Sequence, residues 1–141
     1  MLIERWRADT KWSVDRLESM YCLAVCRRED VRSLRDLTAH HLPMLRNLKV
    51  KCLQCIREKF GIPTSEVRAY VHYPPSFYHF HVHFVRTGVR MPGSEAGRAH
   101  LLDDIIENLE VDPNHYERRC LSMSLGAAHP LFVSIPKTCL E

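Results

Sequence analysis

Residues 79–85, with the sequence HFHVHFV, place a histidine at every second position and a hydrophobic residue in each gap. Successive side chains of a β-strand point to opposite faces of the sheet. The hydrophobic residues would therefore face a core, and the other face would carry His79, His81 and His83, called here the histidine row. Neighbouring members of such a row lie about 7 Å apart. The stretch predicts a strand that closes a core on one side and presents imidazoles on the other.

The spacing of the histidine row suits a single tetrahedral phosphate, which two adjacent imidazoles can touch together. His72, near the end of the preceding predicted strand, and Ser76, in the intervening loop, would add contacts. Imidazole can act as a nucleophile, as a general acid or base, or as a hydrogen-bond donor. Because crowded imidazoles resist being charged together, one can stay neutral and nucleophilic while others, protonated, hold an anion. The sequence therefore predicts a site for phosphate chemistry.

Two alternatives stay open from the residues alone. A His-x-His pair on a strand with a third histidine is also a zinc arrangement, although no nearby carboxylate stands out to orient the ligands. The row could instead be a solvated polar face, which would be the better interpretation of a single histidine than of three in register.

Composition indicates one soluble compact domain spanning residues 1–141, with 45% hydrophobic and 26% charged residues. The net charge of +3 favours an anionic ligand but is too small to indicate a nucleic-acid groove by itself. No apolar run approaches the roughly 20 residues that cross a membrane, and the start of the chain lacks an apolar signal core. We therefore expect a cytoplasmic or nuclear protein without a membrane partner.

Four of the six cysteines form two close pairs, Cys22 with Cys26 and Cys52 with Cys55. Together they could hold a structural zinc ion, but neither pair lies in a glycine-rich knuckle. The pairs also fall on the apolar sides of a predicted strand and a predicted helix, where a thiol behaves as a small hydrophobe. Buried free thiols are the favoured interpretation.

Two amphipathic helices are predicted. The first covers residues 39–60, after an N-cap at Thr38, and ends at Gly61. The second covers residues 98–109 and ends before Pro113, which cannot continue a helix. A short polar helix or turn is expected at residues 12–20.

Strands are predicted where hydrophobic residues alternate or form short runs: residues 21–26, 66–73, 79–86 and 120–125. The second and third are close enough in sequence to form an antiparallel hairpin across Pro74-Pro75, and residues 88–97 are expected to be a loop. Two main helices with about five mostly antiparallel strands make an α+β domain.

The stretch 79–85 resembles the histidine-triad pattern, His-φ-His-φ-His-φ-φ with φ hydrophobic, of a superfamily that binds nucleotides and hydrolyses or transfers nucleotidyl groups. Further segments resemble the scavenger mRNA decapping enzymes of that superfamily: residues 33–38, 41–43, 72–78, 98–102 and 106–110. This resemblance runs from about residue 9 to residue 131 and implies the histidine-triad fold.

The resemblance implies that His81 is the nucleophile. It would attack the phosphate attached to 7-methylguanosine in a cap dinucleotide or a short capped RNA, forming a covalent nucleotidyl-histidine. Water would then release 7-methylguanosine monophosphate, and no metal or other cofactor would be needed. The activity implied is that of a hydrolase, a nucleotide pyrophosphatase of the scavenger decapping type.

The same resemblance implies the roles of the surrounding residues. His72, Ser76, His79 and His83 match positions in the phosphate site. In the segment DTKW at residues 9–12, Asp9 would contact the methylated base and Lys11 a phosphate, as their opposite charges allow.

The family enzymes carry a separate N-terminal domain, which supplies an aromatic residue that stacks on the methylated base. The present sequence begins about where their catalytic domain begins, so that domain is expected to be absent. The resemblance also implies a homodimer. Two alternative functions stay open: a cap- or nucleotide-binding module with weak or no catalysis, and a general histidine-triad nucleotide hydrolase.

Overall fold

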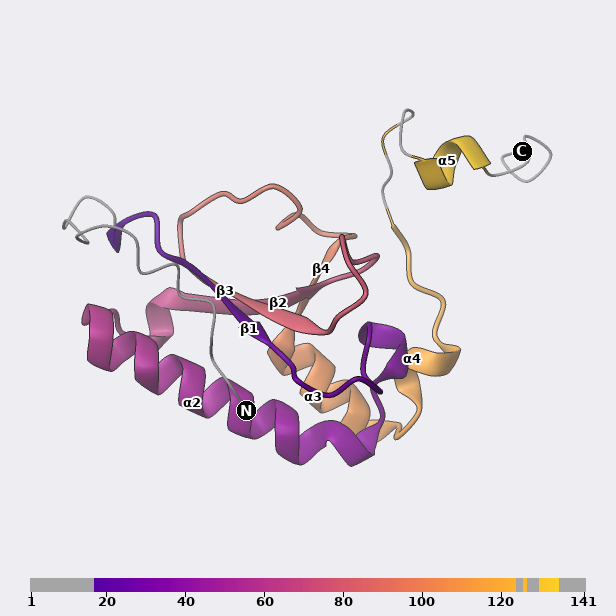
Figure 1. Ribbon diagram of the computed structural model, residues 1–141, viewed down its shortest axis with the longest axis horizontal. Coiled ribbons are helices and arrows are strands. Elements are labelled where there is room, and N and C mark those ends of the chain that lie inside the picture. Colours follow the sequence, from indigo (N-terminus) through magenta and orange to yellow (C-terminus); the bar gives the residue numbers. More distant parts are fainter. Residues whose placement is uncertain (1–16, 124–125, 127–129, 135–141) are drawn as a thin grey trace.

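The computed structural model describes residues 17–123, 126 and 130–134. Within them, an antiparallel sheet of four strands, in the order β1-β3-β2-β4, is covered by helices on one face (Figure 1). The strands are β1 (Tyr21–Val25), β2 (Val67–His72), β3 (His81–Arg86) and β4 (Ala99–Leu101). The helices are α2 (Leu42–Phe60), α3 (Leu102–Val111), α4 (His115–Arg118) and α5 (Pro130–Ser134). The predicted α+β class is confirmed.

The central hairpin of β2 and β3 has the predicted antiparallel pairing, with Tyr70 opposite His83. The connecting residues include a cis Tyr73-Pro74 peptide bond. β1 completes the other side of β3 and pairs Leu23 with His83. β2, which carries His72, and β3, which carries His81 and His83, are therefore the two inner strands of the sheet.

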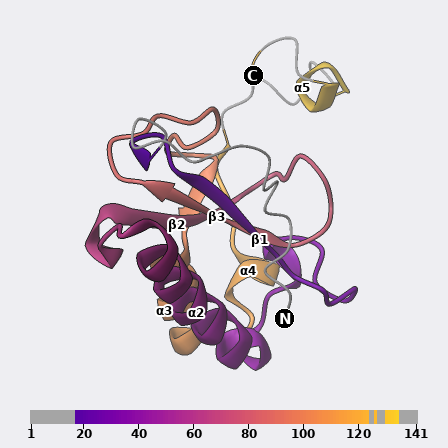
Figure 2. The ribbon, with the colours of Figure 1, turned by 60° about the vertical axis from the view of Figure 1, so that its left-hand side comes forward.

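The hydrophobic residues of the HFHVHFV stretch face the core as predicted. Phe80, Val82 and Phe84 are at most 1% exposed and pack in one cluster with the buried side of α2. Figure 2 shows α2 and α3 side by side beneath the sheet. On the opposite face, the segment between β3 and β4 arches over the strands (Figure 1). The site face therefore lies between the sheet and this loop.

The first predicted helix is confirmed in position and in its buried face. It begins with a 3-10 turn at Ala39–His41, where the Thr38 backbone N–H donates to Nδ1 of His41. At its end, Gly61 adopts the left-handed conformation with φ of 66° that closes many helices. Leu45, Leu48, Cys52 and Ile56 form the buried stripe.

The second predicted helix starts later than expected. Residues 99–101 form the edge strand β4, with His100 opposite Val71, and α3 begins only at Leu102. Pairing with β2 satisfies the backbone hydrogen-bonding groups of these residues. The helical spacing of the later leucines and isoleucines does not indicate this pairing, so the helix was predicted to begin too early.

The prediction of a strand at residues 120–125 is wrong for residues 120–123. Residues 120–123 have no regular structure, and residues 124 and 125 lie outside the described ranges. No strand of the described sheet pairs with this segment, and an apolar run without a ladder partner has nothing to hold it extended. Of the helix or turn predicted at residues 12–20, only the last four residues are described.

Three of the cysteines gather between β1 and α2, where Cys22, Cys52 and Cys55 line one small cavity. All three are free thiols. Burial raises the pKa of Cys22 to about 12 and that of Cys52 to about 11, so both stay protonated at neutral pH. This agrees with thiols that act as small hydrophobes. In the described ranges, no helix is both long and apolar enough to cross a membrane.

Candidate active site

Three imidazoles lie close together on the face of the inner hairpin that points away from the helices. The ring centroids of His72 and His83 lie 4.1 Å apart, and those of His81 and His83 lie 5.0 Å apart. All three residues are buried, with exposed fractions of 5–8%. His81 and His83 alternate along β3, and His72 follows two residues after Tyr70, which is opposite His83. The predicted grouping of these three histidines is confirmed.

The orientation of His81 is set by a hydrogen bond to the backbone. Its Nδ1 lies 2.7 Å from the carbonyl oxygen of His79. Because a carbonyl can only accept, Nδ1 must carry the proton, and the lone pair of the neutral ring is on Nε2. This ring is therefore prepared to attack an electrophile, or to accept a proton, through Nε2.

His83 is held between two tyrosines. The Tyr21 hydroxyl lies 2.9 Å from Nδ1 of His83, and the Tyr70 ring stacks on the imidazole with centroids 5.1 Å apart and planes within 4°. Burial, with smaller contributions from the charges of His72, His81 and Arg98, lowers the pKa of His83 to about 3. His83 is therefore neutral at physiological pH, and its Nε2 is buried without a hydrogen-bond partner in the described part of the chain.

His72 closes the cluster on the β2 side. Burial lowers its pKa, and the charges of Arg98 and His81 lower it further. Gly93, in the loop that arches over the sheet, has a φ of +81°, and a Cβ on it would lie 3.1 Å from Nε2 of His72. The loop backbone thus approaches the imidazole more closely than a side chain would allow.

Sequence reasoning did not assign a role to Arg98. Its guanidinium acts on the pKa values of both His72 and His83, and a Cβ on Gly93 would lie 3.3 Å from its Cδ. Arg98 sits directly before Ala99, which pairs with His72. The helix predicted over residues 98–109 gives no reason to place Arg98 beside the histidines. The missed edge strand is what brings this positive charge to the histidines.

Tyr21 and Tyr70 were also missed, although alternation gave a signal for Tyr70. Tyr70 lies two residues before His72 in a predicted strand, so the two share a face. Tyr21 belongs to the predicted strand at residues 21–26, but the sequence does not show which strand lies beside the histidine row.

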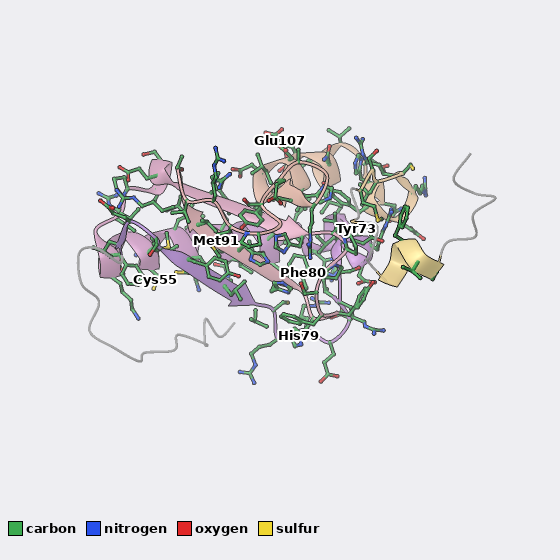
Figure 3. The ribbon with its side chains drawn as sticks, turned by 90° about the horizontal axis from the view of Figure 1, so that it is seen from above. Cys55, Tyr73, His79, Phe80, Met91 and Glu107 are labelled. Atoms are coloured by element: carbon green, nitrogen blue, oxygen red, sulfur yellow. The ribbon has the colours of Figure 1, made fainter. Side chains whose placement is uncertain are left out.

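His79 departs from the common face that the sequence predicted. β3 begins at His81, so His79 precedes the strand. Its Nε2 donates to the carbonyl oxygen of Cys26, and the residue is exposed. Figure 3 shows His79 near the margin of the sheet. A proline-containing loop and this tether turn the side chain away, so the row contributes two imidazoles to the cluster and His79 contributes its backbone.

The loop between β2 and β3 carries the remaining candidates. Ser76 is exposed in this loop. The Phe77 ring stacks on the imidazole of His81, with centroids 4.4 Å apart and planes within 10°. Asp9 and Lys11 lie outside the described residues, so their predicted contacts stay predictions. Among residues 17–123, 126 and 130–134, no group of three or more His, Cys, Asp or Glu side chains is arranged to hold a metal ion.

An antiparallel sheet that orients the imidazole of His81 within a histidine cluster, with the half-buried guanidinium of Arg98 close to His72 and His83, defines a site for histidine-based chemistry on an anionic substrate. A family model described as "Scavenger mRNA decapping enzyme C-term binding" matches residues 8–98. The chain therefore belongs to the scavenger mRNA decapping family.

Similar curated proteins carry the name m7GpppX diphosphatase. The Rattus norvegicus protein is 46% identical over 129 residues, which cover 92% of this chain and 38% of that protein. The Homo sapiens protein is 47% identical over 123 residues, which cover 87% of this chain and 36% of that protein. The Schizosaccharomyces pombe protein is 34% identical over 125 residues, which cover 88% of this chain and 41% of that protein. The chain thus spans about two fifths of the length of these relatives.

Proposed function

We propose that the protein is a hydrolase of the histidine-triad superfamily that cleaves the 5'-5' triphosphate of 7-methylguanosine cap dinucleotides or short capped RNA, without a metal ion. The observation that carries the proposal is the 2.7 Å bond from Nδ1 of His81 to the His79 carbonyl, which leaves Nε2 as the nucleophilic atom. The names of the relatives, which refer to an m7GpppX substrate, support the choice of substrate.

In the proposed first step, Nε2 of His81 attacks the phosphorus bonded to the 7-methylguanosine. A P–N bond forms, and the bond from this phosphorus to the bridging oxygen breaks. The leaving diphosphate, free or still attached to RNA, keeps the electron pair and takes up a proton from solvent. The Nδ1–H bond to the His79 carbonyl stabilises the positive charge that develops on the ring.

In the second step, water attacks the same phosphorus. A P–O bond forms, the P–N bond breaks, and its electron pair returns to Nε2 of His81. The water loses a proton to solvent, and 7-methylguanosine monophosphate leaves. His81 thus ends in the state in which it began.

The other cluster residues would bind the triphosphate. His72 and His83 are held neutral by burial, and each has a buried Nε2 without a partner in the described ranges. These atoms could donate to phosphate oxygens if they carry the ring proton. Arg98 supplies a permanent positive charge beside them. Ser76 and Lys11 would add phosphate contacts, and Asp9 would contact the methylated base.

The test is hydrolysis of a methylated cap dinucleotide and of its unmethylated analogue, in the presence of a chelator. We expect 7-methylguanosine monophosphate as a product and its loss in His81→Asn. A matched control is His40→Asn, since His40 is exposed at the start of the α2 region. Turnover that requires added metal ion, or that survives in His81→Asn, would contradict the proposal.

The same assay separates the alternative functions. Binding of the cap without turnover would indicate a binding module. Faster cleavage of nucleoside phosphoramidates or dinucleoside polyphosphates than of caps would indicate a general histidine-triad hydrolase.

We also propose that the protein is a homodimer that acts in the cytoplasm, the nucleus or both. Support for pairing comes from β4, an edge strand on which Leu101 is 45% exposed. Light scattering coupled to size exclusion tests it, since a monomer at all concentrations would contradict a dimer.

A further inference from the structure

Two aromatic side chains of the loop that precedes β3 are not used by the proposed chemistry. Phe77 is 48% exposed and Tyr78 is 58% exposed. Phe77 stacks on the His81 imidazole, and Tyr78 follows it directly in the loop. Adjacent exposed aromatic rings at the edge of an active site offer flat apolar surface to a ligand.

The surface continues from Tyr78 toward a basic side chain. The guanidinium carbon of Arg32 lies 6.0 Å from the centroid of the Tyr78 ring. The two segments are adjacent because the Phe80 backbone N–H donates to the carbonyl of Val31 over 3.3 Å. A shallow hollow of about 260 Å³ lies here, and its lining residues are Arg32, Ser33, Asp36 and Tyr78.

The polar groups of this hollow are already engaged. Oδ2 of Asp36 accepts from the backbone N–H groups of Arg32 and Ser33, at 2.9 and 2.7 Å, and from the Ser33 hydroxyl at 3.2 Å. The Ser33 hydroxyl accepts in turn from the Arg35 N–H at 3.1 Å. Oδ2 of Asp36 is thus engaged with the turn that it caps, whereas the guanidinium of Arg32 lies over the Tyr78 ring, where a ligand would stack.

We propose that Phe77, Tyr78 and Arg32 form a binding subsite for the RNA body, meaning the nucleotides that follow the cap in a short capped fragment. This inference rests on the proposed function. The nucleobase next to the triphosphate stacks on Phe77, and the next one stacks on Tyr78 with its phosphate near Arg32. Stacking on aromatic rings tolerates any base, as a site for RNA of varied sequence requires.

The charge of Arg32 decides between the RNA body and the cap base. The 7-methylguanine ring is cationic, so a neighbouring guanidinium disfavours it. The phosphodiesters of the RNA body are anionic, and the same guanidinium attracts them. The subsite therefore fits the chain beyond the cap.

The experiment compares kcat/KM for a methylated cap dinucleotide and for a capped tetranucleotide, in the wild-type chain and in Tyr78→Ala and Arg32→Ala. We expect the loss on the tetranucleotide to exceed the loss on the dinucleotide by about fivefold to tenfold. The matched control is Arg57→Ala, which removes an exposed charge from α2, on the opposite side of the sheet, and leaves the ratio unchanged.

A second measurement keeps this inference separate from the proposed function. Fluorescence anisotropy follows binding of the two labelled ligands to His81→Asn, with and without each further substitution. We expect Arg32→Ala to weaken tetranucleotide binding. We also expect the slope of log affinity against log salt concentration to become shallower by about 0.7. If the wild-type chain cleaves neither substrate, the proposed function fails, and this binding comparison still decides the subsite. Equal losses on both ligands, or losses on neither, would overturn the subsite.

Discussion

Nδ1 of His81 donates to the carbonyl oxygen of His79, two residues earlier, over 2.7 Å. The first histidine of the row thus acts on the second through its backbone, while its own side chain is bonded to the Cys26 carbonyl. The side chain and the backbone of His79 therefore have separate roles, which mutation can separate.

We predict that His79→Ala lowers kcat on a cap dinucleotide by about tenfold or less, because the carbonyl that orients His81 remains. His81→Asn should lower kcat by more than about a thousandfold, because it removes the proposed nucleophile. Single-turnover kinetics with detection of 7-methylguanosine monophosphate measures both. Equal losses in the two variants would show that the imidazole of His79 also takes part.

Gly93→Ala should impair activity more than it impairs stability. Its φ of +81° strains any L-residue by about 1 kcal/mol, and the new methyl group would press on Nε2 of His72. Gly88→Ala is the matched control, because Gly88 has a φ of +95° and no atom within 4 Å of the added Cβ. Urea unfolding should show similar losses in the two variants, and only Gly93→Ala should lose kcat/KM. Parallel losses of kcat/KM in both would contradict the close approach to His72.

The pKa of His83 should be measurable by NMR titration of its ring carbons. Burial lowers that pKa from 6.5 to about 3, so the ring should stay neutral down to about pH 4. The unfolded chain binds this proton between pH 6.5 and 3 and the folded chain does not, so the stability from neutral His83 is present above pH 6.5 and is lost as the pH falls. A ring that titrates near 6.5 in the folded protein would contradict the burial argument.

Tyr21→Phe removes the hydroxyl that bonds Nδ1 of His83 at 2.9 Å. The expected loss of stability is about 1 kcal/mol, and kcat/KM on the cap dinucleotide should fall about tenfold because the ring of His83 loses a positioning contact. Tyr116→Phe is the control, since the Tyr116 hydroxyl accepts from Asn108 at 3.0 Å, away from the cluster. A stability loss of similar size without an activity loss is expected there. If Tyr21→Phe retains full activity, the orientation of His83 does not depend on this bond.

The alternation of HFHVHFV was enough to predict the inner strand, its buried face and the meeting of His81, His83 and His72. Each of these follows from a two-residue period and a short connection. The position of His79 did not follow, because the strand begins later than the pattern and the tether to Cys26 joins residues that are far apart in sequence. Arg98 was missed for a related reason: its place beside His72 depends on β4, a three-residue strand whose pairing overrides the helical pattern that follows.

The order β1-β3-β2-β4 places β2, which carries His72, and β3, which carries His81 and His83, in the middle of the sheet. Edge strands open first in native-state fluctuations, whereas central strands open only near global unfolding. Fraying of β1 or β4 would therefore detach Tyr21 or Arg98 while the imidazoles kept their mutual geometry. Amide exchange should be slowest along Val82 to Phe84, and the arrangement of the rings should persist for as long as the domain remains folded.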